Sequence, residues 1–111
     1  MTTNLKPLRQ RINAADERIR EHVRQTYLEH STVLSDLCAG RVYCKLENLQ
    51  HTGSFKLRGA FNKVLSLTEA DRNKGIVTSS SGNHGAGVAY VLNALKQSGT
   101  VYVPENVVLE K

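Results

Sequence analysis

Three stretches of the chain repeat apolar residues at helical spacing. They cover residues 13–23, 55–67 and 84–97, and each pattern predicts a helix with one buried face. Asn13 is a predicted N-cap for the first helix, and residues 98–99 are the predicted end of the third. The predicted core consists of one apolar stripe from each helix: Ala15, Ile19, Val23, Leu57, Ala60, Phe61, Val64, Leu65, Val88, Val91, Leu92 and Leu95.

Between the helices, short apolar or alternating runs predict strands at residues 41–47, 75–78 and 100–103. Residues 29–36 are compatible with a short extended piece followed by a turn of helix. Alternation of helices and strands predicts right-handed crossovers and a parallel sheet. We therefore expect an α/β protein that forms part of a three-layer open parallel sheet with flanking helices. Because the strands are few and residues 107–111 look like the opening of another element, we expect a fragment of a larger fold.

Composition narrows the class of protein. The 111 residues suffice for one small domain, and the net charge of +5 comes from cations scattered among acids, which argues against a nucleic-acid partner. The spacing of Cys38 and Cys44 fits no zinc pattern. We therefore expect the two cysteines to be small buried hydrophobic residues, and we expect no metal site. No apolar run reaches membrane-spanning length and the N-terminus has no apolar signal core. We expect a reduced, cytoplasmic protein without a membrane partner.

A loop of small residues, 79–83, lies between the predicted strand at 75–78 and the third helix. Ligands of open parallel sheets bind at the carboxyl ends of strands, where the next helix directs its free N–H groups. Serine hydroxyls and a glycine at such a place suit a carboxylate or a phosphate. The alternative is an ordinary helix start, with Ser81 or Asn83 as the capping residue.

A second loop leads into the helix at 55–67 with the residues SFKLRG. At the mouth of a helix, Lys56 would share the positive dipole end with Arg58 and lie partly buried beside Phe55. Both effects would favour the neutral amine, which is a nucleophile for an aldehyde. The alternative is a solvated lysine near a helix start.

Taken together, the two loops resemble a known family. Residues 47–60, ENLQHTGSFKLRGA, closely resemble the cofactor-lysine segment of threonine and serine dehydratases, and residues 80–85, SSGNHG, resemble the second signature of that family. Those proteins are pyridoxal-phosphate enzymes of the tryptophan synthase β fold type, also called fold type II. The resemblance extends from about residue 15 to the end of the chain. It implies a pyridoxal 5'-phosphate cofactor and a small amino-acid substrate.

The resemblance also implies roles for matching positions. Lys56 would bind the cofactor aldehyde as a Schiff base and later remove the α-proton of the substrate, Phe55 would pack near the cofactor ring, and Asn83 would hydrogen-bond the phenolic oxygen of the ring. The substrate carboxylate would be held by the loop and the helix start, namely Ser80, Ser81, Gly82, Asn83 and His84. Ser81 matches the serine that faces the opposite side of the cofactor in family members that racemise, so we count it with Lys56 as a catalytic candidate.

The implied reaction is α,β-elimination from L-threonine or L-serine, which yields a 2-keto acid and ammonia. In the family, residues 1–50 would join the large domain, and residues 51–111 would be an incomplete small domain. The phosphate loop of the family has no counterpart in this chain, so we expect negligible activity from the isolated chain. The resemblance also implies a homo-oligomer as the active form. Two alternatives stay open: a relative resembling serine racemase, and a non-catalytic truncated homologue that associates with itself.

Overall fold

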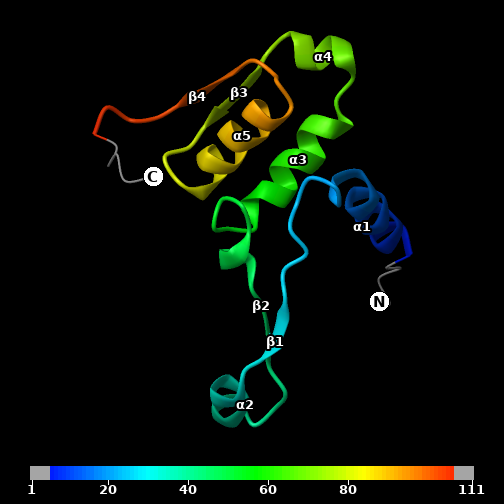
Figure 1. Cartoon of the computed structure of the whole chain (residues 1–111), viewed down its shortest axis with the longest axis vertical. Coiled ribbons are helices and arrows are strands. Elements are labelled where there is room, and N and C mark those ends of the chain that lie inside the picture. The colour runs from blue at the N-terminus through cyan, green and yellow to red at the C-terminus, as the bar shows by residue number, and fades with distance from the viewer. Residues whose placement is uncertain (1–5, 107–111) are drawn as a thin grey trace, which may run out of the picture.

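A computed structural model describes residues 6–106 of the chain (Figure 1). The elements, in order, are α1 (Lys6–Ile19), β1 (Leu28–His30), α2 (Thr32–Cys38), β2 (Tyr43–Lys45), the 3-10 helix η1 (Glu47–Leu49), α3 (Lys56–Ser66), α4 (Glu69–Asn73), β3 (Ile76–Ser79), α5 (Asn83–Ala94) and β4 (Gly99–Tyr102). The apolar stretch expected to open another element, residues 107–111, lies outside the described residues.

The core lies where α1, α3 and α5 pack together, and the apolar stripes of the sequence predict it correctly. Its eight buried hydrophobic residues all belong to the predicted set: Ile19, Leu57, Ala60, Phe61, Val64, Val88, Val91 and Leu92. Val23, Leu65 and Leu95 pack against them while partly buried. The helices α3 and α5 share the largest part of this interface, and α1 adds to it by packing on α3 (Figure 1). This packing fixes the starts of α3 and α5 relative to each other.

The expected parallel pairing is confirmed for β3 and β4. Ile76 pairs with Gly99 and Ser79 with Tyr102, and α5 forms the crossover between the two strands. Helix α5 covers one face of this pair, whereas Val77 (67% exposed) and Tyr102 (61%) lie on the other face. The α/β class is therefore confirmed. Within residues 6–106, however, no helix layer covers the second face of the sheet, so the expected three-layer arrangement is incomplete.

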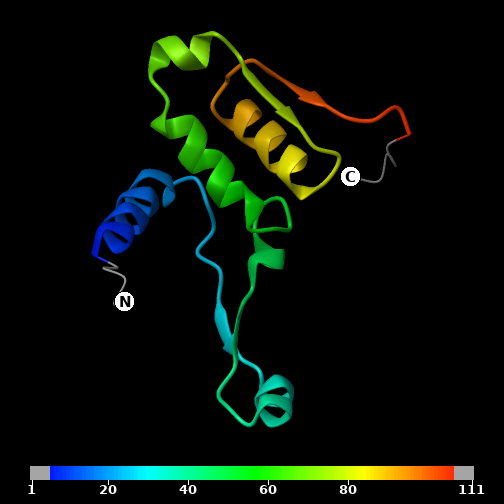
Figure 2. The same ribbon diagram turned by 180° about the vertical axis from the view of Figure 1, so that it is seen from behind.

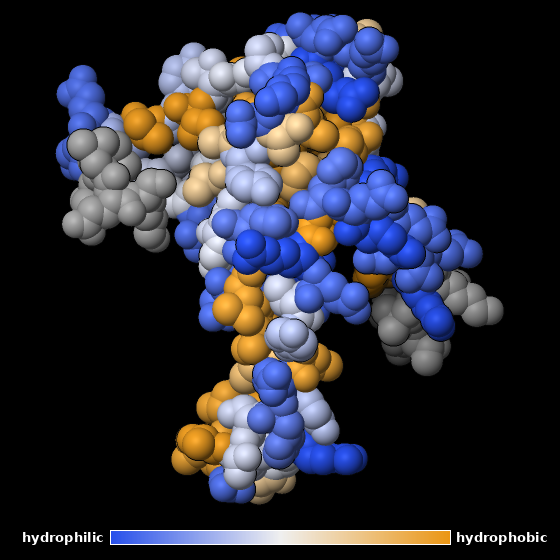
Figure 3. All heavy atoms as spheres, viewed as in Figure 1, coloured by the Kyte–Doolittle hydropathy of each residue, from blue (hydrophilic) through white to orange (hydrophobic). Residues whose placement is uncertain are grey.

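The first two strands correct the expectation of an all-parallel arrangement. β1 and β2 pair antiparallel, with Leu28 opposite Lys45 and His30 opposite Tyr43. The reason is topological, because α2 only turns the chain back at the tip and provides no crossover. The three elements form an arm that projects from the helical body (Figures 1 and 2). No residue of α2 is buried, and apolar side chains, among them Val33 and Leu37, gather at the tip of this arm (Figure 3).

The predicted start of the first helix is wrong. Asn13 lies inside α1, which is already helical from Lys6 and ends at Ile19 rather than at Val23. Pro7 is compatible with a first helical turn, where its missing N–H costs nothing. The side chains of Leu8 and Ile12 are more than half exposed. The first turns of the helix are therefore not packed against the core, and the apolar pattern predicted only the packed part of the helix.

The third predicted helix ends earlier than expected. α5 stops at Ala94, Lys96 takes the left-handed conformation (φ 53°), and the N–H of Gln97 donates to the Leu92 carbonyl at 2.9 Å. Gly99 does not close the helix but opens β4, where a Cβ would lie closer than 3.0 Å to the Ile76 carbonyl oxygen. The glycine is explained by this close approach of two strands.

Two smaller features also differ from expectation. The short helix α4 had no apolar pattern to predict it, and its start is capped by Thr68, whose hydroxyl accepts from the N–H of Asp71 at 3.1 Å. Cys38 is exposed rather than buried, and Cys44 is half-buried. Of the helices in residues 6–106, none combines the length and the apolar character needed to cross a membrane.

Candidate active site

Lys56 is the first residue of α3, as the sequence indicates. Phe55 precedes it with helical backbone angles (φ −69°, ψ −13°) and provides no side-chain cap. The expected partial burial is wrong, because both side chains are exposed and Phe55 retains 61% of its accessible surface. The Nζ atom of Lys56 lies 5.1 Å from the centroid of the Phe55 ring. The amine is thus free to reach a ligand at the mouth of the helix.

The loop before α5 also has an open helix start. Gly82, in extended conformation (φ −123°, ψ −153°), precedes the helix without a side-chain cap, so the alternative of a helix start capped by Ser81 or Asn83 is wrong. The hydroxyl of Ser80 accepts from the N–H of Gly82 at 3.3 Å and so shapes the loop. Ser81 and Asn83 have exposed side chains. Since the N–H groups of a first helical turn have no partner within the helix, this end of α5 favours an anion.

The start of α3 lies against a glycine of α5. A Cβ added to Gly87 would lie 3.4 Å from the backbone N of Leu57 and 3.4 Å from the carbonyl carbon of Lys56. Asn83 is four residues before Gly87, so both lie on the same face of α5. Asn83 therefore lies on the side of α5 that faces α3.

His84 departs from the rest of the predicted anion loop. Its Nε2 lies 3.0 Å from the hydroxyl of Thr78 on β3. The ring also lines a cavity between α3 and β3 together with Ala60 and Val88. The imidazole is therefore held against the strand, whereas Ser80, Ser81 and Gly82 form the loop in front of α5.

The segment before Lys56 is fixed by side-chain contacts and contains two unpaired hydroxyls. His51 stacks on Tyr90 of α5 with ring centroids 5.4 Å apart. The buried hydroxyls of Thr52 and Ser54 have no hydrogen-bond partner among the described residues, and Ser54 is only 7% exposed. Buried hydroxyls normally pair, so two hydroxyls without a partner among the described residues make the segment before Lys56 unusual.

Sequence reasoning missed an ion pair beside Lys56. The Nε and Nη2 atoms of Arg58 donate to the two carboxylate oxygens of Glu47, each at 2.8 Å, and the hydroxyl of Thr26 donates to the same carboxylate at 2.5 Å. The hydrogen bonds from Arg58 lower the pKa of Glu47 to about 2, against desolvation that raises it, and the bond from Thr26 lowers it further. Glu47 in turn raises the pKa of Arg58. The signal in the sequence was one acid at the end of a strand and one arginine in the first turn of the next helix.

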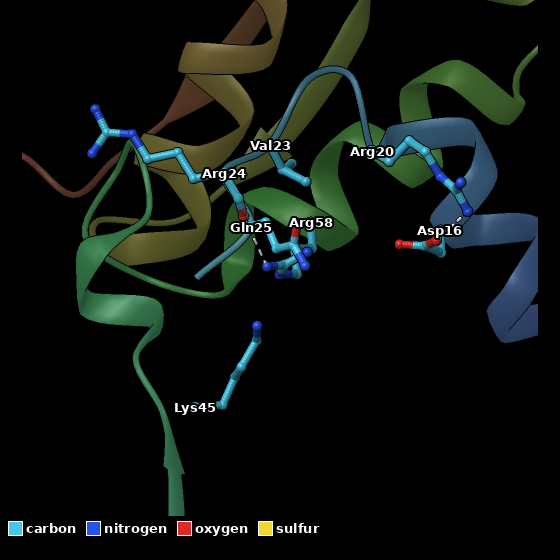
Figure 4. A pocket seen from close by; sticks show the side chains of 7 residues that line it. All are labelled: Asp16, Arg20, Val23, Arg24, Gln25, Lys45 and Arg58. Atoms are coloured by element: carbon cyan, nitrogen blue, oxygen red, sulfur yellow. Dashed lines mark hydrogen bonds and ion pairs between the residues drawn. The ribbon is translucent and has the colours of Figure 1, made fainter. Parts of the chain in front are cut away.

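A cavity of about 500 Å³ lies beside this ion pair, lined by Asp16, Arg20, Val23, Arg24, Gln25, Lys45 and Arg58. The side chains of Lys45 and Arg58 point into the same space, whereas the guanidinium of Arg24 is turned away (Figure 4). Arg20 pairs with Asp16 at 2.6 Å, and the Lys45 amine donates to the Thr26 carbonyl. Within residues 6–106, no cluster of three or more histidine, cysteine or acidic side chains could hold a metal ion.

Comparison with known proteins gives matches over nearly the whole chain. The chain is 42% identical over 100 residues to an L-threonine ammonia-lyase of Thermotoga maritima, which corresponds to 90% of this chain and 25% of that protein. It is 43% identical over 91 residues to the catabolic L-threonine dehydratase of Escherichia coli, covering 82% of this chain and 28% of the relative. The chain thus spans between a quarter and a third of the length of these relatives.

A solved structure is similarly close. The serine racemase of Dictyostelium discoideum superimposes with a TM-score of 0.84 at 39% identity, over 90% of this chain and 33% of that one. The model of a family described as pyridoxal-phosphate dependent enzymes matches residues 19–111. This segment includes α3, α5 and the loop before α5 that contains Ser80, Ser81 and Gly82, which we call the serine loop. The chain therefore belongs to the pyridoxal-phosphate dependent enzyme family.

Proposed function

We propose that the chain is the N-terminal part of a pyridoxal-phosphate dependent threonine/serine dehydratase. The observation that carries the proposal is the contact of Gly87 with the backbone at Lys56 and Leu57. It places a lysine at one helix start beside a second helix start with a serine loop. Relatives described as an L-threonine ammonia-lyase and an L-threonine dehydratase support the choice of reaction.

The residues at this site fit the aldehyde and ring portion of the cofactor. Lys56 offers an exposed amine, Phe55 an exposed aromatic face, and Asn83 an exposed amide on the face of α5 that meets α3. In the segment before Lys56, the hydroxyls of Thr52 and Ser54 have no hydrogen-bond partner among the described residues. We propose that Lys56, Phe55 and Asn83 hold this end of the cofactor.

The loop before α5 suits the carboxylate of an amino acid. Ser80, Ser81 and Gly82 lead into a helix start whose N–H groups favour negative charge. Asn83 is the first helical residue and can donate from its side chain as well. His84 would contribute through its backbone, because its imidazole is bonded to Thr78.

Bound pyridoxal phosphate supplies an electron sink for cleavage at the α-carbon of the substrate. Lys56 Nζ would hold the cofactor aldehyde, and the same amine would accept the α-proton of the bound substrate. The net reaction would be loss of water from L-threonine or L-serine, followed by hydrolysis of the product to a 2-keto acid and ammonia. Both roles require the amine at the helix mouth, where it is exposed.

The proposed function also implies a domain organisation. Residues 1–50 would join the large domain, and residues 51–111 would form part of the small one. The packing of α1 on α3 means that the two portions meet along the site helix. We propose a homo-oligomeric active form in the reducing cytoplasm, a compartment consistent with the free thiols of Cys38 and Cys44.

A serine racemase-like activity is the second candidate. Its support is the exposed side chain of Ser81 together with the TM-score of 0.84 to the Dictyostelium serine racemase. Racemisation needs a second acid–base group on the opposite side of the substrate from Lys56, and Ser81 is the candidate for it. Elimination does not need that group, so the two functions differ in their dependence on Ser81.

A chimera tests the proposal, in which this chain replaces the matching segment of the Thermotoga relative. We expect the folded chimera to release 2-oxobutanoate from L-threonine, and Lys56→Ala to abolish the release. Lys63→Ala, on an exposed position of the same helix, is the matched control. A folded chimera that binds pyridoxal phosphate but forms neither keto acid nor D-serine would contradict the proposed function. D-serine formation that is lost in Ser81→Ala would favour the racemase.

A further inference from the structure

The first turn of α3 contains Lys56 and, two residues later, Arg58. Arg58 binds Glu47 through a two-bond fork, with Nε to Oε2 and Nη2 to Oε1 at 2.8 Å each. A bidentate pair of this kind restricts direction as well as distance, because both planar groups must align. The side chain of Arg58 is therefore held in one orientation.

The acceptor is itself immobilised. The Glu47 side chain is only 13% exposed and accepts a third hydrogen bond from Thr26, a residue that is 7% exposed. A carboxylate removed from water to this degree depends on all its donors. The low pKa of Glu47 reflects the same bonds. Glu47 thus serves as a fixed point at the start of η1.

The fork also connects to the chain between α1 and β1. The carbonyl of Arg24 accepts from Arg58 Nη2 at 3.2 Å (Figure 4). It also accepts from Gln50 Nε2 at 3.0 Å. Gln50, only 3% exposed, binds the N–H of Arg24 at 2.9 Å through its carbonyl oxygen. Three segments, residues 24–26, residues 47–50 and the first turn of α3, are joined around one guanidinium.

Residues two apart in an α-helix leave the axis about 200° apart. The side chains of Arg58 and Lys56 therefore point to opposite sides of the same turn, and holding one fixes the rotation of the other. We propose that Glu47 and Arg58 are positioning residues that set the direction in which Lys56 presents its amine at the site. This inference rests on the proposed role of Lys56, and it assigns to the ion pair a function beyond cross-linking the fold.

The test uses the 111-residue chain and pyridoxal phosphate, with borohydride reduction and mass-spectrometric mapping of the lysine adducts. The variants are Glu47→Gln and the double variant Glu47→Gln with Arg58→Met. The double variant leaves no unpaired charge behind, so its fold recovers stability relative to the single variant. Asp71→Asn is the matched control, because it breaks an exposed ion pair with Lys74 at 2.8 Å on α4.

We expect the share of adduct on Lys56 to fall by about tenfold in both variants, at a folded fraction matched by circular dichroism, and to stay unchanged in Asp71→Asn. A purely structural ion pair gives another result, in which the double variant regains both stability and labelling of Lys56. That result overturns the proposal.

Amide hydrogen exchange provides a second readout that does not use the cofactor. We expect faster exchange of the N–H groups of Arg58, Ala60 and Phe61 in Glu47→Gln, with unchanged exchange in α5. Labelling spread evenly in the unsubstituted chain contradicts the role of Lys56 itself, whereas labelling that stays selective in every variant contradicts only its positioning. Exchange in the first turn of α3 that equals that of the unsubstituted chain also overturns the inference.

Discussion

Gly85 of α5 lies against the backbone carbonyl of Ser80, so closely that an added Cβ would come within 3.0 Å of that oxygen. The same added Cβ would lie 3.3 Å from the Cγ1 atom of Val101 on β4, so the strand restricts movement of the helix. The serine loop and the start of α5 are thus packed together at a position where only hydrogen fits. This contact holds the proposed anion site in shape.

Gly85→Ala is expected to lower the free energy of unfolding by about 1–2 kcal/mol, since overpacking costs more than the gain in helix propensity returns. It should also displace residues 80–82, seen as shifted amide resonances there. Gly87→Ala is the matched control, because its Cβ meets Leu57 at 3.4 Å, an ordinary contact distance. Equal destabilisation by the two substitutions would contradict the packing described for Gly85.

The Glu47 ion pair predicts acid sensitivity. The pKa of Glu47 is about 2 in the folded chain, below its ordinary value of 4.5. Its contribution to stability is therefore complete above pH 4.5 and is lost as the pH falls towards 2. We expect a loss on the order of 2 kcal/mol over this range after solvent screening, measured by urea unfolding at several pH values. A Glu47→Gln chain should lose correspondingly less stability over the same range, and identical pH profiles would refute this role.

The uncovered face of the β3–β4 pair predicts self-association of the isolated chain. Val77 and Tyr102 expose 67% and 61% of their surfaces there, and a second copy of the chain can cover them by symmetry. Sedimentation velocity should show concentration-dependent dimers, weakened about tenfold or more by Val77→Thr, which keeps the β-branched shape. A chain that stays monomeric at high micromolar concentrations contradicts this expectation.

The sequence was most informative where buried apolar residues recur with the period of a helix. All eight core residues were predicted from the helical stripes, and the helix at Lys56 and the parallel pairing of β3 with β4 followed from the same patterns. The errors fall at element ends. The start of α1 extends past its packed face, and the end of α5 is set by Lys96 in a left-handed conformation, which no residue type announces.

At the proposed site, the candidate residues come from the resemblance, but their contacts could not be predicted from the sequence. The direction of the His84 ring depends on Thr78, six residues earlier, and the Glu47–Arg58 fork depends on how three separated segments fold back together. Gly85 and Gly87 gave a usable hint, since two glycines inside a helix lower its propensity and indicate close packing. The exposure of Phe55 and Lys56 had no signal of its own in the sequence.

One measurement directly tests whether the start of α3 makes Lys56 the reactive lysine. The unsubstituted chain is treated with substoichiometric pyridoxal phosphate, reduced with borohydride and mapped by mass spectrometry across its seven lysines. We predict that most of the adduct lies on Lys56 and that Lys63, exposed on the same helix, carries little. Adduct shared in similar amounts by Lys56 and Lys63 would contradict the account.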